Sequence, residues 1–303
     1  MALATARLQD PEHRRVTVVL PDRLTDEVRG ICAESAADWP GELRLLPLPQ
    51  PERGILPRLG DPGRNHAYQI ITGVRASKST HVLLHDADLF LPGSGAHREQ
   101  FERAVAHDAV AVGVEPAWDP WFAARGRTLA ATWDMVASVE WLRSFPPHRL
   151  MGHDAEVDGQ LHTFDTTFWG QLHTPQERLL VAMPQGGVLH FNYVISTYRR
   201  FLRARGPFRD KNFRLLLVRA FTDLFDPRPE ASPLPHLEGL VAGLGKTGAQ
   251  VCYSASDAAA YQEFRSTFDA MLRGPWARTA ASDLAEQYLR PFDDFFAEQI
   301  TGR

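Results

Sequence analysis

Apolar and polar residues alternate in blocks along the first third of the chain, and these blocks predict strands and helices in turn. Runs rich in β-branched and leucine residues at Arg15–Leu20, 42–48 and His81–His85 have the length and composition of buried strands. Thr25 precedes two acids and has the character of a helix N-cap between the first two runs. Residues 65–76 place apolar side chains on one helical face. Strands that alternate with helices predict a parallel sheet.

The rest of the chain carries further patterns, and helical periodicity dominates towards its end. They predict a loop at the proline-rich residues 47–62, helices at 97–107, 127–145 and 195–205, and strands at 109–114, 188–193 and 250–253. We therefore expect an α/β fold with a mainly helical C-terminal extension. Its expected regions are a ligand-binding α/β half at 1–116, a second, tryptophan-rich half at 117–206, and the helical extension at 207–303.

Composition narrows the class of protein without naming a function. The chain has 303 residues, of which 44% are hydrophobic and 23% charged, as in ordinary globular proteins. A formal net charge of −4 argues against a partner nucleic acid, because phosphates call for a basic surface. No apolar run approaches the roughly 18 residues of a membrane span, so we expect a cytoplasmic protein. Cys32 and Cys252 are far apart and predict neither a disulfide framework nor a thiolate metal site.

The strongest chemical signal is the pair of carboxylates in Asp86-Ala87-Asp88, directly after the predicted strand His81–His85. Open parallel sheets bind ligands at the carboxyl ends of their strands. Residues two apart in an extended segment point to the same side, so both carboxylates can face one ligand. Such oxygens suit Mg²⁺ or Mn²⁺ and leave coordination positions for a diphosphate. The alternative is a turn in which the carboxylates cap backbone amides.

The surroundings of this pair resemble a known family. Residues 63–74 contain Arg64-Asn65 on a predicted helix, and the strand that follows ends in the Asp-x-Asp pair. This order resembles the GT-A glycosyltransferases, particularly the family 2 group, in which the first strand also ends in a proline, as Leu20-Pro21 does here. The resemblance implies a GT-A (Rossmann-like) fold with a mostly parallel sheet flanked by helices. It also implies a Mn²⁺- or Mg²⁺-dependent enzyme that transfers a hexosyl-type unit from a nucleoside-diphosphate sugar to a small-molecule or glycan acceptor, with inversion.

The resemblance also implies further site residues. A metal-binding histidine is expected after the acceptor region, and His190 stands there; a histidine in the core is the alternative reading. An inverting enzyme needs a carboxylate that takes the proton of the acceptor hydroxyl. Asp165 is our first choice, because burial among its aromatic neighbours would raise its pKa; a helix-capping role is the alternative. Asp154, in a segment expected to be an exposed loop, is the second choice.

Further residues are expected to bind the donor or the acceptor because of where they stand in the sequence. Pro21 and Asp22 end the first strand where a base or ribose would lie, and Arg64 can reach a phosphate. Three tryptophans offer flat apolar faces to an acceptor or, equally, to the core, namely Trp118, Trp121 and Trp169. The second predicted strand lacks the acidic pair that recognises uracil in the family, so the base stays open.

Other functions remain as alternatives. A nucleotidyltransferase uses a similar fold, but its glycine-rich loop after the first strand is missing in residues 21–25. A phosphatase carries its Asp-x-Asp on the first strand, whereas Asp86 comes later. A non-catalytic nucleotide-sugar-binding module would keep the site without turnover. Gly245-Lys246-Thr247 lacks the earlier glycine of a P-loop. The C-terminal third is expected to form either part of the acceptor site or a homodimer contact.

Overall fold

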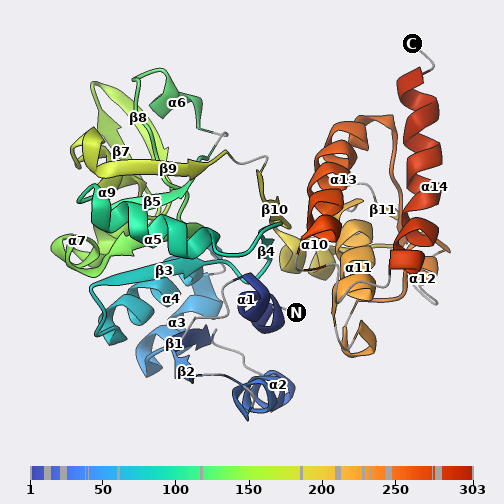
Figure 1. Ribbon diagram of the computed structural model, residues 1–303, viewed down its shortest axis with the longest axis horizontal. Coiled ribbons are helices and arrows are strands. Elements are labelled where there is room, and N and C mark those ends of the chain that lie inside the picture. The colour runs from blue at the N-terminus through green and yellow to red at the C-terminus, as the bar shows by residue number, and fades with distance from the viewer. Residues whose placement is uncertain are drawn as a thin grey trace. The chain divides into compact units, whose positions relative to one another are not determined.

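The structure is a computed structural model, and it groups the chain into two compact units (Figure 1). Unit 1 comprises Met1–Gln9, Ala87–Ser94 and Gly186–Arg303, and unit 2 comprises Asp10–Asp86 and Gly95–Gln185. The described residues are 2–9, 15–20, 26–37, 39, 41–59, 62–116, 119–184, 187–208, 213–226, 229–232, 234–242, 248–274, 276 and 282–301. The regions expected at 1–116, 117–206 and 207–303 are defined by the roles expected of them, and they remain a prediction.

Unit 2 is an α/β unit whose strands are flanked by helices (Figure 1). Its strands are β1 (Arg15–Leu20), β2 (Glu42–Pro47), β3 (His81–His85), β5 (Ala111–Val114), β6 (Asp134–Ser138), β7 (His153–Val157), β8 (Gln160–Phe164) and β9 (Leu179–Met183). Its helices are α2 (Asp26–Ala37), α3 (Gln50–Leu59), α4 (Pro62–Ala76), α5 (Ala96–Ala106), α6 (Pro120–Ala123), α7 (Val139–Ser144), α8 (Pro147–Leu150), α9 (Phe168–Leu172) and the 3₁₀ turn η1 (Gln176–Arg178). The predicted strands β1, β2, β3 and β5 and the predicted helices α2, α4 and α5 are confirmed within a few residues.

The central sheet of unit 2 has four strands in the order β3-β6-β5-β9 and is mixed. Strand β6 runs antiparallel to both β3 and β5, and only β5 and β9 are parallel. Strands β1 and β2 form a separate parallel pair. The expected mostly parallel sheet is therefore wrong for this sheet, because a strand that the sequence did not predict is inserted between β3 and β5.

Strand β6 and the irregular residues 127–133 before it replace the first part of the helix predicted at 127–145. Met135, Val136 and Ala137 of β6 are all buried, because neighbouring strands and helices cover β6 on both faces. A strand buried on both faces is a continuous apolar run, and such a run cannot be distinguished from a buried helix by periodicity alone. The helix begins only at α7, where the Ser138 side chain accepts a hydrogen bond from the backbone N–H of Trp141.

The loop predicted at 47–62 is also wrong, because helix α3 occupies residues Gln50–Leu59. Prolines are unfavourable inside a helix, which is why the sequence predicts a loop there. Pro51, however, lies in the first turn of α3, where a backbone N–H has no partner within the helix in any case. Leu56 on the same helix is buried, so its contacts add to the stability of a helix that the local sequence disfavours.

Gly113 in the centre of this sheet leaves no room for a side chain. A Cβ atom there would lie 2.6 Å from the backbone oxygen of Asp134 and 3.1 Å from the Cβ atoms of Ala130 and Met135. We expect Gly113→Ala to lower the free energy of unfolding by about 1–3 kcal/mol, measured by urea denaturation. Gly30→Ala in α2 is the control, because nothing lies within 4 Å of its Cβ position. Equal stability of Gly113→Ala and the wild-type protein would contradict the packing.

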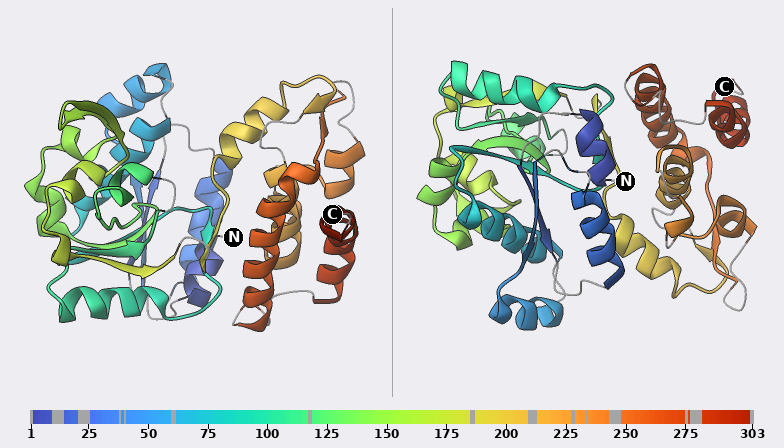
Figure 2. Two further views of the ribbon diagram at one scale, coloured as in Figure 1. Left: turned by 90° about the horizontal axis from the view of Figure 1, so that it is seen from above. Right: turned by 60° about the horizontal axis from the view of Figure 1, so that its bottom comes forward.

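Unit 1 is mainly helical, as predicted for the C-terminal extension. Its elements are α1 (Ala2–Gln9), β4 (Leu89–Phe90), β10 (Leu189–His190), α10 (Val194–Phe201), β11 (Pro207–Phe208), α11 (Phe213–Phe225), α12 (Leu237–Ala242), β12 (Gln250–Val251), α13 (Ala258–Arg273), α14 (Ser282–Thr301) and the 3₁₀ turns η3 (Pro229–Ala231) and η5 (Ala255–Asp257). Helices α11, α13 and α14 lie side by side (Figure 2). None of the described helices combines the length and apolar character that crossing a bilayer requires.

An aromatic core holds a short segment from the middle of the chain inside unit 1. The ring of Phe90 in β4 lies 4.5 Å, between centroids, from that of Phe221 in α11, and the ring of Phe191 lies 5.5 Å from it. Trp276 donates its indole N–H to the backbone oxygen of Leu91 at 3.0 Å. Residues 87–94 are therefore fixed by contacts with the C-terminal part of the chain, and Asp88 belongs to this segment.

Candidate metal centre

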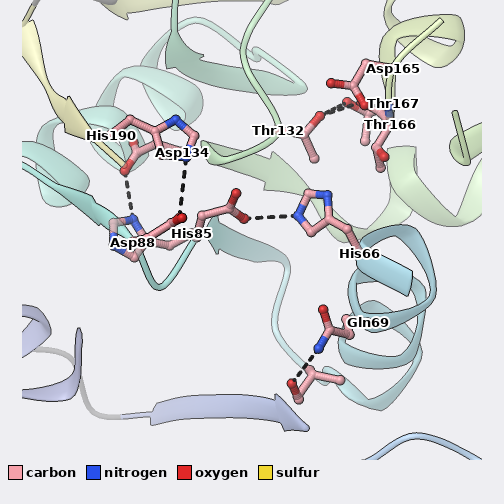
Figure 3. Close-up of polar contacts among 12 residues, drawn as sticks. His66, Gln69, His85, Asp88, Thr132, Asp134, Asp165, Thr166, Thr167 and His190 are labelled. Atoms are coloured by element: carbon pink, nitrogen blue, oxygen red, sulfur yellow. Dashed lines mark hydrogen bonds and ion pairs between the residues drawn. The ribbon is translucent and has the colours of Figure 1, made fainter. Parts of the chain in front are cut away.

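In unit 1 the structure brings together Asp88 and His190, as the resemblance implied. Strand β4 pairs antiparallel with β10, so that His190 lies opposite Leu89. The backbone N–H of Phe191 donates to the carbonyl oxygen of Asp88 at 3.0 Å. His190 Nε2 then lies 3.5 Å from Asp88 Oδ1 (Figure 3). The side chain of His190 is 6% exposed and that of Asp88 40% exposed, so a nearly buried imidazole faces an accessible carboxylate.

Asp86 is the last residue of this stretch that belongs to unit 2. Its backbone N–H donates to the carbonyl oxygen of Trp133 at 2.9 Å, which extends the pairing of β3 with β6. Its Oδ1 lies 3.0 Å from Nε2 of His66 on α4. Asp88 follows two residues later, and two residues of chain span at most about 7 Å. The Cα atoms of Asp86 and Asp88 therefore lie within that distance of one another.

His66 is a residue of this region that the sequence analysis did not select. It follows Arg64-Asn65 on α4, and Gln69, one turn further, donates to the backbone oxygen of Val19 at 3.2 Å (Figure 3). The two polar side chains are three residues apart and so share a helix face. That spacing, next to the apolar face of the helix, was the signal that could have identified them.

The residues present fit the divalent ion that the resemblance implies. Carboxylate oxygens and an imidazole nitrogen are ligands that Mn²⁺ accepts, and Mg²⁺ favours the oxygens. Ligand atoms bound to one such ion at about 2.1 Å lie roughly 3.0 Å apart at right angles. The 3.5 Å between His190 Nε2 and Asp88 Oδ1 requires only a small shift to meet that value. The implied ion thus has suitable ligands.

The expected base Asp165 is not buried, and that part of the prediction is wrong. Its neighbours Phe164 and Thr166 are buried, whereas Asp165 itself is exposed between them. Its Oδ1 accepts a hydrogen bond from the backbone N–H of Thr166 at 2.7 Å. Since strand residues alternate in direction, the burial of Phe164 turns its neighbour towards solvent. The carboxylate supports a local turn ahead of α9, close to the capping role that was the alternative.

Asp154 lies on a hairpin rather than in the expected loop. Strands β7 and β8 pair antiparallel, and Asp158 and Gly159 at their turn have positive φ values of 52° and 74°. Two residues with positive φ are the requirement of a tight two-residue hairpin turn. Asp154 accepts a hydrogen bond from the Thr163 hydroxyl at 2.6 Å across the hairpin. Its carboxylate is exposed, as predicted.

The two described tryptophans of the predicted acceptor site are engaged with other rings. Trp121 stacks on His162 with ring centroids 4.3 Å apart, and the guanidinium of Arg125 lies 3.7 Å from its ring centroid. Trp169 has its centroid 4.3 Å from that of His173, with Arg149 over the ring at 4.6 Å. Both therefore pack in an aromatic cluster beside the hairpin. Trp118, and likewise Pro21, Asp22 and Thr25, lie outside the described residues; Arg64 is exposed on α4.

A second group of ionisable side chains is buried in unit 2, and the sequence analysis did not select it. Asp134 Oδ2 lies 2.9 Å from His85 Nδ1 and 3.0 Å from His97 Nε2 (Figure 3 shows the first contact). Gln100 donates its amide N–H to Asp134 Oδ1 at 2.8 Å. Burial acts to raise the pKa of Asp134, but the hydrogen bonds with His85 and His97 outweigh it and hold the pKa well below its ordinary value. Asp134 is therefore an ionised carboxylate.

A broad surface hollow of about 750 Å³ also lies in unit 2, but away from these residues. Ser79, His81, Ser138 and Arg143 are among its lining residues. It therefore opens at the amino end of β3, whereas Asp86 follows the carboxyl end. The candidate site is identified by its position after the carboxyl end of β3, and it does not coincide with this hollow.

Comparisons with known proteins add no relative to this description. Searches of protein-family models, of curated proteins and of solved structures each found no match of significance. The site is therefore interpreted from its own residues and contacts.

Proposed function

We propose that the protein is a metal-dependent glycosyltransferase. It transfers a hexosyl-type unit from a nucleoside-diphosphate sugar to an acceptor hydroxyl, with inversion. The observation that carries this proposal is the pair Asp88 and His190, which lie 3.5 Å apart although they are distant in sequence. A carboxylate of the Asp-x-Asp motif and a later histidine are the combination that the resemblance to GT-A enzymes implies.

The residues divide the chemistry as follows. Asp88 and His190 of unit 1 would hold Mn²⁺ or Mg²⁺, and such an ion would offset the negative charge that develops on a departing diphosphate. His190 is the last residue of β10 and its side chain is 6% exposed, so it presents Nε2 to Asp88 from a restricted position. The exposed Asp165 or Asp154 would take the proton of the acceptor hydroxyl. Arg64 on α4 would donate hydrogen bonds to phosphate.

The same proposal assigns unit 2 to a GT-A fold. Its support is the parallel pair β1–β2, followed by α4 and then β3, whose carboxyl end leads into the carboxylates. Ligands of α/β sheets bind at such ends. Asp88 and His190 belong to unit 1, where the neighbouring Leu189, Phe90 and Phe191 are part of its hydrophobic core.

Binding and turnover of donors test the proposal directly. We expect one nucleoside diphosphate among UDP, GDP and dTDP to raise the melting temperature of the full chain more with Mn²⁺ than without, because a ligand of the folded state stabilises it. Metal-dependent hydrolysis of the matching nucleotide sugar would then distinguish an enzyme from a binding module. Binding that is indifferent to Mn²⁺ would contradict the proposal.

Substitution of the two exposed acids tests which one is the base. We expect Asp165→Asn to lower kcat by about 10²- to 10⁴-fold, because an amide cannot accept the proton, while donor affinity stays the same. Asp154→Asn is compared with it, and Glu156→Gln on the same face of β7 is the control. Unchanged kcat in Asp165→Asn would remove Asp165 from the mechanism, and a loss confined to Asp154→Asn would transfer the role to Asp154.

A further inference from the structure

The cluster around Asp134 differs in chemistry from the proposed centre at Asp88. It offers two imidazole nitrogens and one carboxylate oxygen, from β3, α5 and β6 of the same unit. Nitrogen-rich sets of this kind favour borderline transition-metal ions over Mg²⁺. The side chains of Asp134 and His97 are 0% and 3% exposed, so the set is built into the core rather than scattered on the surface.

We propose that His85, His97 and Asp134 form a metal site in unit 2 that takes a divalent transition-metal ion of the Zn²⁺ type. His85 Nδ1 and His97 Nε2 converge on the same carboxylate oxygen, at 2.9 and 3.0 Å. The three ligand atoms all lie within 4.8 Å of one another. Ligands bonded to one Zn²⁺ at about 2.0–2.1 Å lie roughly 3.0–3.4 Å apart, so the two nitrogen–oxygen distances need to change by only a few tenths of an ångström to admit the ion.

The second oxygen of Asp134 supports the same interpretation. Oδ1 accepts the amide N–H of Gln100 at 2.8 Å, which fixes the plane of the carboxylate and leaves Oδ2 to the two histidines. Carboxylates that bind metals are themselves held by hydrogen bonds in this manner. His85 is 20% exposed, so an ion can enter on its side.

Among the described residues, the ion-pair partners of Asp134 are the two histidines. A buried carboxylate is unfavourable unless opposite charge or hydrogen bonds compensate it. One divalent ion would compensate Asp134 and use both imidazoles in their neutral form. This inference does not depend on the glycosyltransferase proposal, because it involves none of the residues assigned to the donor or the acceptor.

The test uses the full chain without a histidine tag, stripped by a chelator and then titrated with Co²⁺ or Zn²⁺. The titration is made in Asp88→Asn, so that binding at Asp88 and His190 does not contribute. We expect one equivalent of Co²⁺ to bind with the visible absorption of nitrogen ligation, and Zn²⁺ to displace it. Adding His97→Gln to this parent is expected to weaken binding at least about 100-fold, since loss of a ligand exceeds the 10- to 100-fold cost of losing its supporting hydrogen bonds.

His81→Gln in the same parent is the matched control, because His81 lies on the same strand and contacts Thr80 instead of the cluster. It is expected to keep the metal. Unchanged affinity in His97→Gln would overturn the proposal. If His97→Gln does not fold, the folded Asp88→Asn parent decides: absence of a one-equivalent Co²⁺ spectrum there shows a hydrogen-bonded cluster without an ion, and it also overturns the proposal.

Discussion

Replacement of Asp88 by asparagine is expected to lower kcat for transfer or donor hydrolysis by about 10²- to 10³-fold. The substitution keeps the shape of the side chain and removes its charge, so the ion that would bind the diphosphate loses a negatively charged ligand. The Mn²⁺-dependent rise in melting temperature with nucleoside diphosphate should disappear in the same variant. His190→Gln is expected to weaken Mn²⁺ binding as well, because the amide oxygen is a poorer ligand than the imidazole at that position.

Asp108→Asn is the control for Asp88→Asn. The side chain of Asp108 is 93% exposed and pairs with Arg178 at the surface, so the variant removes the same charge without touching the candidate site. Circular dichroism of both variants tests for intact folds. If Asp88→Asn kept its Mn²⁺-dependent binding of nucleoside diphosphate and its turnover, Asp88 would not be a metal ligand and the proposed function would lose its main support.

Replacement of Arg219 by alanine is expected to lower the free energy of unfolding by about 3–5 kcal/mol. Arg219 lies in α11 with 2% of its side chain exposed, and it pairs with Asp223, which is 9% exposed. It also donates to the backbone oxygen of Leu234 at 2.7 Å. Its removal leaves a buried carboxylate without its cation and a carbonyl oxygen without its donor. Urea denaturation followed by circular dichroism measures the change.

Arg265→Ala provides a matched comparison in the same unit. Arg265 pairs with Asp269 at the same spacing along α13 and also with Asp293 of α14 at 3.3 Å, but the side chains of Arg265, Asp269 and Asp293 are 28%, 42% and 39% exposed. Solvent screens such a pair, so its loss is expected to cost at most about 1 kcal/mol. Equal effects of the two substitutions would show that burial of Arg219 does not govern its contribution.

The Arg219 variant also bears on the candidate site. Phe221 lies two residues from Arg219 on α11 and contacts Phe90 and Phe191, which follow Asp88 by two residues and His190 by one residue along the chain. A loosened α11 is therefore expected to weaken the positioning of the site as well as the fold. Hydrogen exchange of residues 87–94 in Arg219→Ala would report this loss directly, as faster exchange than in Arg265→Ala.

Several elements could be read from the sequence because their causes are local. Strand β1 is a run of β-branched residues closed by a proline, and helix α4 shows its apolar face at helical spacing. The position of Asp86 at the end of β3 follows from the same pattern. In each case, residues within one turn or one strand of each other carry the information, so no distant contact is needed to interpret it.

The errors arose where distant parts of the chain decide the local structure. Strand β6 has no alternating pattern, because other elements cover both of its faces, and the central sheet becomes mixed through that strand. The pairing of β7 with β8 determines which side chains near the end of β8 face the core. Phe164 faces the core and Asp165 faces solvent, although aromatic residues lie beside Asp165 in sequence. Aromatic neighbours along the chain do not determine which side of a strand faces the core.

The sequence by itself determined the α/β character of unit 2, the helical C-terminal part and the carboxylate pair at the end of β3. Only the tertiary structure decided which histidines meet which carboxylates: His190 lies beside Asp88 through the pairing of β4 with β10, and His85 and His97 meet Asp134 through β3, α5 and β6. The physical reason is that the spacing of apolar and polar side chains along the sequence depends on local backbone geometry. The residues of a ligand set, in contrast, are brought together by packing and strand pairing between segments far apart in the chain.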